Sequence, residues 1–190
     1  MLILGSLGFN YTQNRLKIGE LVPEQNGRML IIPLACTFEA ETGEKEKNGA
    51  AMLDFKRENI YVFDRAKPEE YLNRSYDYIV VPGGNTFKLL QYVREFHLDS
   101  FIRQQVENGA VYLGFSAGAY LACQNIEYVQ NFDANDHITN GDFTALGLTE
   151  KYVLCHFDSR GEKEIELCRS YIGYKPELIT INDAQLIVLP

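Results

Sequence analysis

The feature that most constrains the fold of this chain is the alternation of short apolar runs with segments of helical periodicity. The runs are nearly unbroken, which is typical of strands covered on both faces of a parallel sheet. Between two of them, residues 98–106 carry a single apolar stripe at helical spacing. The pattern therefore predicts an α/β sandwich with a mostly parallel sheet. The predicted strands are Met29–Ile32, Ile60–Phe63, Tyr78–Val81, Val111–Phe115, Tyr152–Phe157 and Leu178–Ile181.

Length and charge narrow the class of protein further. The chain has 190 residues and no linker-like stretch, which predicts one domain, residues 1–190. Its formal net charge of −8 disfavours a broad nucleic-acid surface. No apolar run approaches the roughly 18 residues of a membrane span, and Met1–Gly5 is too short for a signal peptide. We expect a cytoplasmic monomer or homodimer that binds neither nucleic acid nor a membrane.

The cysteines do not have the spacing of a metal or redox site. Zinc ribbons and thioredoxin-like sites need closely spaced pairs, and this chain has no CxxC. Each cysteine lies in or beside an apolar run, so we expect reduced, buried thiols, no metal and no other cofactor. The four are Cys36, Cys123, Cys155 and Cys168.

The segment Gly114–Gly118 reads G-F-S-A-G and lies between a predicted strand and a helix of small residues. This is the pattern of a nucleophile elbow, in which a serine stands on a sharp strand-to-helix turn. The turn brings the residues two before and two after the serine too close for side chains, which explains glycine at both positions. We predict that Ser116 is a nucleophile and that the Ala117 N–H is an oxyanion donor.

A serine hydroxyl needs a general base, and the chain has three histidines. His97 precedes the helix of residues 98–106, and His137 lies in a polar loop. His156 lies at the end of the Tyr152–Phe157 run, where a strand end meeting that of Val111–Phe115 would bring it to Ser116. We predict that His156 is the base.

The acid that would orient this histidine has two main candidates. Asp183 follows the predicted strand Leu178–Ile181, whereas Asp133 lies in the loop between Ser116 and His156. We rank Asp183 first because a strand end is a firmer mount than a loop. Asp133 remains the alternative.

A second glycine-rich turn, Pro82–Thr86, ends another predicted strand and opens a helix. Paired glycines let backbone N–H groups approach a ligand, and a helix N-terminus favours developing negative charge. Gly84 is our candidate for the second oxyanion donor. Gly83 and Asn85 are candidates for substrate contact, although Thr86 could also merely cap the helix.

Three segments together resemble peptidase family S51, which includes dipeptidase E and, more distantly, the cyanophycinases. They are VPGGNTF at Val81–Phe87, GFSAGAYLAC at Gly114–Cys123 and CHF at Cys155–Phe157. The resemblance implies a three-layer, class I glutamine amidotransferase-like fold of flavodoxin-like topology. It also implies Ser116 as nucleophile, His156 as base, and oxyanion N–H groups at Gly84 and Ala117. Family assignments of the acid fall near Asp133 or near Asp183.

The resulting hypothesis is a serine-type peptidase that hydrolyses short peptides through an acyl-enzyme. The resemblance to dipeptidase E adds dipeptides with an N-terminal aspartate as candidate substrates. Binding an aspartate requires a cation, and Arg160 is the one near the predicted base. Two alternatives remain at this stage. One is another acyl hydrolase, an esterase or amidohydrolase, on the same elbow. The other is a non-catalytic relative that binds a small metabolite.

Overall fold

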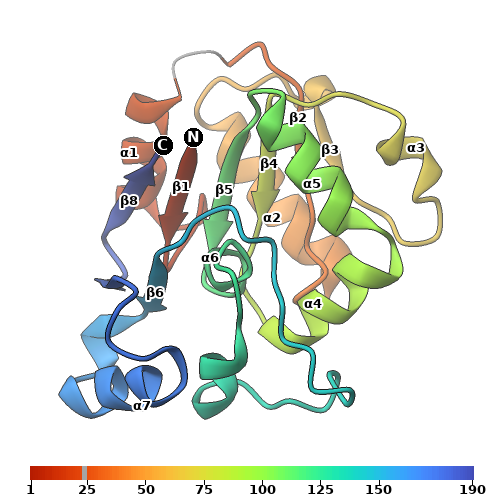
Figure 1. The fold of residues 1–190 in the computed structure, drawn as a ribbon. Coiled ribbons are helices and arrows are strands. Elements are labelled where there is room, and N and C mark those ends of the chain that lie inside the picture. Colours follow the sequence, from red (N-terminus) through yellow and green to blue (C-terminus); the bar gives the residue numbers. More distant parts are fainter. Residues whose placement is uncertain (23–24) are drawn as a thin grey trace.

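A six-stranded sheet forms the centre of the computed structural model, which describes residues 1–22 and 25–190. Its strands stand in the order β3-β2-β4-β5-β1-β8, and all neighbours are parallel except β1 and β8, as the arrowheads in Figure 1 show. The α/β class with a mostly parallel sheet is thereby confirmed. The strands are β1 (Leu2–Gly5), β2 (Met29–Ile31), β3 (Ile60–Val62), β4 (Tyr78–Val81), β5 (Val111–Phe115) and β8 (Leu186–Leu189).

The order of β2 to β5 is that of the first four strands in a flavodoxin-like sheet. The neighbour of β5 on the far side is β1, which the sequence analysis considered only as a possible leader. Leu4 of β1 pairs with Gly114 of β5, and Val81 of β4 pairs with Gly114 from the other side. The strand that leads to Ser116 therefore lies between β1 and β4, in the middle of the sheet.

Helices cover both faces of this sheet. Alternate strand residues face opposite ways, so that Ile79 and Val81 join one core while Tyr78 and Val80 join the other. The first core contains residues of α4, α5 and α6, and the second contains residues of α1 and α2. These helices are α1 (Thr12–Leu21), α2 (Glu39–Ala51), α4 (Thr86–Glu95), α5 (Leu98–Glu107) and α6 (Ala117–Leu121). Shorter helical segments are α3 (Glu69–Leu72), Arg57–Asn59, Glu127–Asn131 and Phe157–Ser159.

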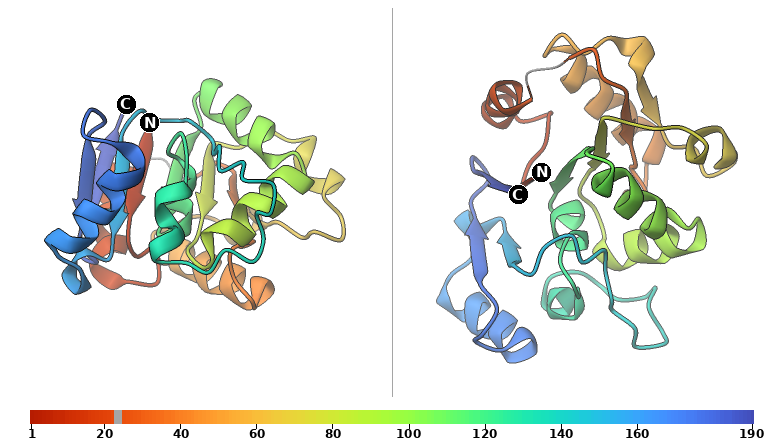
Figure 2. Two further views of the ribbon diagram at one scale, coloured as in Figure 1. Left: turned by 60° about the horizontal axis from the view of Figure 1, so that its bottom comes forward. Right: turned by 45° about the horizontal axis from the view of Figure 1, so that its top comes forward.

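The last two predicted strands form a small parallel sheet of their own, β6 (Tyr152–Cys155) and β7 (Leu178–Ile181). With α7 (Glu162–Ile172) they lie next to the β1–β8 side of the molecule, away from α5 (Figure 2). We had expected these strands in the main sheet. A polar contact joins β6 to α6: the Cys155 N–H donates to the Tyr120 hydroxyl over 3.2 Å.

The cysteines are all free thiols in the structure. Cys123, Cys155 and Cys168 are buried, whereas Cys36 is only half-buried. Burial raises the pKa of Cys155 to about 12, so that this thiol stays protonated. Among the helices of the described chain, none combines the length and the apolar composition that crossing a bilayer requires.

Candidate active site

Ser116 stands at the turn from β5 into α6 with the backbone angles φ 51° and ψ −109°. A non-glycine residue pays on the order of 1–3 kcal/mol for such a conformation. Two backbone hydrogen bonds hold it there: the Ser116 N–H donates to the Gly5 carbonyl oxygen (2.9 Å), and the Tyr120 N–H donates to the Ser116 carbonyl oxygen (3.0 Å). The turn therefore points the serine hydroxyl out of the sheet at its carboxyl edge.

Glycine is required on both sides of this turn. A Cβ on Gly114 would lie 2.5 Å from the Gly118 carbonyl oxygen, and a Cβ on Gly118 would lie 2.0 Å from the Val81 carbonyl oxygen. Both distances are far below contact distance, and both obstacles are backbone atoms. The reason given above for the G-x-S-x-G spacing thus holds in atomic detail.

His156 directly follows β6 and has a left-handed backbone, with φ 57° and ψ 39°. Its N–H donates to the Ser6 hydroxyl (2.8 Å), and that hydroxyl donates in turn to the Ile181 carbonyl oxygen (2.8 Å). Ser6 follows β1, so one buried hydroxyl joins the ends of β1, β6 and β7. The imidazole Nε2 lies 3.0 Å from Ser116 Oγ.

Asp183 lies on the other side of this imidazole, with Oδ1 2.7 Å from His156 Nδ1. A carboxylate can only accept, so Nδ1 carries the proton and Nε2 is left to accept from the serine hydroxyl. The backbone of Asp183 is held as well. Its carbonyl oxygen accepts from the buried Asn14 amide (2.8 Å), and its N–H donates to the Asp158 carboxylate.

Asp133 occupies a different place. Its Oδ2 accepts from the Thr86 N–H (2.8 Å) and from the Thr86 hydroxyl, at the first turn of α4. A carboxylate there satisfies a free helix N–H and opposes the positive end of the helix dipole. The structure thus brings Asp183, and not Asp133, into contact with His156.

The glycine turn before α4 lies against the elbow. A Cβ on Gly83 would come within 3.0 Å of the Ser116 Cβ. Gly84 has φ 138°, and a Cβ on it would lie 2.4 Å from the Ala35 carbonyl oxygen. Within the described chain, neither the Gly84 N–H nor the Ala117 N–H has a hydrogen-bond partner. Both donors therefore remain available to a ligand.

Asn85, a candidate for substrate contact, instead uses both ends of its amide within the protein. Its Oδ1 accepts from the Lys88 N–H (2.8 Å) and caps α4, while Nδ2 donates to the Ala134 carbonyl oxygen (2.8 Å). It is not among the residues that line the pocket at Ser116. Asn85 therefore fixes the start of α4 and the loop that carries Asp133.

Arg160, the candidate cation, lies outside that pocket too. Its guanidinium carbon lies 3.8 Å from the centre of the Phe132 ring. Its Nη1 is buried and has no hydrogen-bond partner among the described residues. The guanidinium thus retains a donor that the protein itself does not use.

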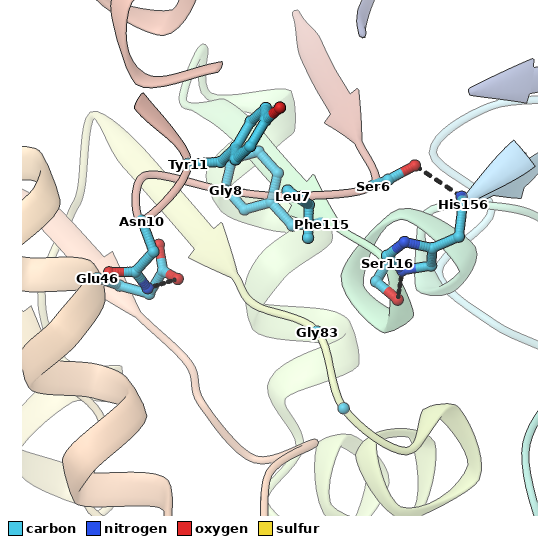
Figure 3. Close-up of a pocket in the computed structure, with 11 residues that line it drawn as sticks. Ser6, Leu7, Gly8, Asn10, Tyr11, Glu46, Gly83, Phe115, Ser116 and His156 are labelled. Carbon is cyan, nitrogen blue, oxygen red and sulfur yellow. Dashed lines mark hydrogen bonds between the residues drawn. The ribbon is translucent and has the colours of Figure 1, made fainter. Parts of the chain in front are cut away.

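A pocket of about 410 Å³ opens beside Ser116 and His156 (Figure 3). Several residues of its lining were not selected by the sequence analysis, and Glu46 of α2 is the charged one among them. Glu46 lies across the pocket from Ser116, with its carboxylate beside Asn10 (Figure 3). The full lining comprises Ser6, Leu7, Gly8, Asn10, Tyr11, Glu46, Gly83, Gly84, Phe115, Ser116 and His156.

Burial raises the pKa of Glu46 to about 7 from an ordinary value of 4.5, against the opposing effect of hydrogen bonds from Phe9 and Asn10. The side chain belongs to the buried face of α2, whose other members include Gly43, Gly49 and Ala50. The one sequence feature that could have indicated its burial is its spacing from Gly43, Gly49 and Ala50, which places Glu46 on the same helix face as these small residues. Apolar periodicity could not find it because that face has almost no large apolar side chain.

The raised pKa predicts a pH-dependent stability. The folded state favours the neutral carboxyl. The contribution of Glu46 to the free energy of unfolding is therefore fully present below pH 4.5 and declines as the pH rises to about 7. The free energy of unfolding of wild type should therefore fall between pH 4.5 and pH 7.5 by about 3 kcal/mol more than that of Glu46→Gln, which has no carboxyl to ionise at this position. Urea unfolding across that range measures it. Parallel stability curves for the two proteins would show that the pKa of Glu46 is not raised.

The arrangement supplies the parts of an acyl-transfer site: a serine that lines a pocket, a base in contact with its hydroxyl, an acid that orients the base, and two free backbone donors. Within residues 1–22 and 25–190, no group of three or more His, Cys, Asp or Glu side chains is placed to hold a metal ion.

Comparisons with known proteins give a consistent assignment. A family model described as peptidase family S51 matches residues 1–190. An uncharacterised peptidase of Listeria monocytogenes, Lmo0363, is 34% identical over 87% of this chain and 83% of its own length. A peptidase E of Salmonella arizonae is 38% identical, but the match covers 62% of this chain and only about half (52%) of that protein.

Solved structures share the fold. The crystal structure of a candidate peptidase E from Listeria monocytogenes superimposes with a TM-score of 0.77 at 24% identity, over 99% of this chain and 93% of the other. A peptidase from an acI-B1 actinobacterium gives a TM-score of 0.70 at 16% identity, over 97% of this chain and 81% of the other. At these identities the likeness concerns the fold alone.

Proposed function

The chain belongs to peptidase family S51 and is a peptidase, and we propose that it hydrolyses short peptides with Ser116 as nucleophile. One observation carries this proposal: a continuous line of contacts runs from the Ser116 hydroxyl through the imidazole of His156 to Asp183. Its two distances, 3.0 Å and 2.7 Å, are those of hydrogen bonds. This is the geometry in which a neutral histidine takes the proton of a serine.

The reaction proceeds in two halves. Ser116 Oγ attacks the carbonyl carbon of the scissile bond while His156 Nε2 takes the hydroxyl proton. His156 then donates that proton to the departing amine, and an ester joins Ser116 to the acyl part of the peptide. Water, activated by the same nitrogen, hydrolyses the ester. Throughout, Asp183 keeps the imidazole in one orientation and stabilises its cationic form.

The negative charge that develops on the carbonyl oxygen needs donors fixed in advance. The N–H groups of Gly84 and Ala117 are our candidates, because both are unpaired and both flank Ser116 in the fold. Gly84 is held by the close approach of its backbone to Ala35. Neither donor would have to move as the reaction proceeds.

An N-terminal aspartate in the substrate would require a cation within reach of Ser116. Arg160 has an unused, buried donor at Nη1, which supports this role. It does not line the pocket, which opposes the role. We therefore propose short peptides as the substrate class and keep the aspartate preference as one arm of the test.

The test is a panel of free dipeptides, Asp-Xaa members included, beside a panel of small esters, each assayed with wild type and Ser116→Ala. We expect wild type to release free amine from dipeptides and Ser116→Ala to release none. Cleavage confined to Asp-Xaa would establish the aspartate preference and make Arg160 the next residue to substitute. Hydrolysis of esters alone would favour the other acyl hydrolases, and inertness towards both panels would contradict the proposal.

A further inference from the structure

The pocket beside Ser116 has an acidic end that the proposed reaction does not use. Glu46 lies there, separated from Ser116 and His156 by Leu7 and Phe115 (Figure 3). None of the described lining residues is a lysine or an arginine. A negatively charged substrate group entering this end would therefore meet no cation, whereas a positively charged one would meet a carboxylate.

The Glu46 carboxylate has acceptor capacity to spare. Its Oε1 accepts from Asn10 Nδ2 (2.7 Å), and its Oε2 accepts from the Phe9 N–H (3.2 Å). An ionised carboxylate offers about four acceptor positions, so these two contacts leave about half of them unused. The residue is only 6% exposed, and the surface it does expose contributes to the pocket.

Holding the loop of residues 8–10 does not by itself require a charge. Both donors to Glu46 are neutral amides, and a neutral acceptor would satisfy them without the cost of burying a carboxylate. That cost is evident in the raised pKa of about 7. A cation placed against the carboxylate would offset it through a charge-assisted hydrogen bond.

We propose that Glu46 is a specificity-determining residue that receives the basic side chain of a lysine or arginine in the substrate. The inference rests on the proposed peptidase function and names its substrate class. The α-ammonium group of a dipeptide is an unsuitable occupant, because it is two bonds from the carbonyl carbon and must remain beside Ser116. A long basic side chain can span the pocket to Glu46.

The test compares peptides that differ only in charge. Dipeptides Xaa-Ala and Ala-Xaa with Xaa as lysine, norleucine or glutamate are assayed with wild type, Glu46→Gln and Glu41→Gln. Glu41 is an exposed residue of the same helix, with its side chain 61% accessible, so its substitution is a charge-matched control. Wild type should favour lysine over norleucine in kcat/KM by about 10- to 100-fold at one of the two positions.

Glu46→Gln should abolish that preference, and Glu41→Gln should retain it. A residue that only supports the fold would lower kcat/KM for all peptides alike and leave their ratio unchanged. An unchanged ratio in Glu46→Gln, or a wild-type preference for glutamate, would overturn the inference.

A measurement on the wild type removes dependence on the folding of a variant. The lysine-to-norleucine ratio should rise between pH 6 and pH 8, because Glu46 ionises in this range while the substrate lysine stays charged. Tyr11 and His156 share the pocket, and Arg15 of α1 bonds the Phe9 carbonyl oxygen, but none of them shifts the pKa of Glu46. Their effects on catalysis cancel in a ratio of two substrates. A ratio that is constant with pH would contradict the role of Glu46.

Calorimetric binding to Ser116→Ala separates the two proposals. If no peptide is hydrolysed, the peptidase mechanism fails, but lysine peptides should still bind this variant more tightly than norleucine peptides. The added substitution Glu46→Gln should remove the difference. Equal binding of the two peptides to Ser116→Ala would refute the inference about Glu46, whatever the outcome of the activity assays.

Discussion

Replacing Ser116 by alanine should lower kcat by about 10⁵- to 10⁶-fold, to a residual rate set by binding and the oxyanion donors alone. His156 Nε2 lies 3.0 Å from Ser116 Oγ, and no other hydroxyl in the described structure contacts this nitrogen. The loss is large because no second nucleophile can replace the serine. Alanine also fits the backbone turn no worse than serine does. Amine release from the best dipeptide, followed at saturating substrate, measures the effect.

Ser170→Ala is the matched control, because Ser170 is an exposed residue of α7 whose hydroxyl donates to the Leu167 carbonyl oxygen (2.7 Å), within its own helix. Its activity should equal that of wild type. Thermal unfolding of both variants checks that they are folded. A Ser116→Ala protein that retained even one-tenth of wild-type turnover would be incompatible with a serine nucleophile.

Asp183→Asn should lower kcat by about 10⁴-fold while leaving the site assembled. An amide in place of the carboxylate can donate to Nδ1, which leaves the proton on Nε2, the nitrogen that must accept from Ser116. It also removes the charge that stabilises the imidazolium. The measurement is kcat at a pH where the wild type is fully active.

Asp133→Asn is the corresponding control, since the sequence analysis offered both aspartates as the acid. Its carboxylate contacts Thr86 at the start of α4, so the substitution should lower stability by about 1 kcal/mol and kcat by less than about tenfold. If Asp133→Asn were the variant that lost four orders of magnitude, Asp133 would be the acid and the contact between His156 and Asp183 would be incidental.

The parts of this fold that the sequence predicts are those in which local pattern and tertiary role coincide. Strands β2 to β5 are unbroken apolar runs because they are covered on both faces, and each was found within one residue of its bounds. The elbow was found because Gly114 and Gly118 leave no space for a side chain. In both cases the constraint lies on residues close together in the sequence.

Pairing between distant segments could not be predicted in the same way. The apolar start of the chain forms β1, which lies between β5 and the edge strand β8, and β8 comes from the other end of the chain. Tyr152–Cys155 and Leu178–Ile181 have the composition of central strands, yet they form a separate sheet. An apolar run predicts that a strand is buried, but it does not predict which strand lies beside it.

The polar residues that organise the site were likewise beyond local pattern. Ser6 and Asn14 are buried because they bond carbonyl oxygens at Ile181 and Asp183, more than 160 residues away in the chain. Glu46 lies on a helix face of small residues that carries no apolar signal. The roles of Ser6 and Asn14 become apparent only when the fold brings the ends of β1, β6 and β7 together.

The most direct test of the central claim is labelling with a fluorophosphonate, which reacts with a serine only where a base activates it. The protein is incubated with the probe and digested, and the modified residue is located by mass spectrometry, with His156→Ala treated in parallel. We predict one label per chain, on Ser116, and a loss of labelling in His156→Ala. Absence of label from Ser116 in a protein shown to be folded, or equal labelling without His156, would contradict the mechanism.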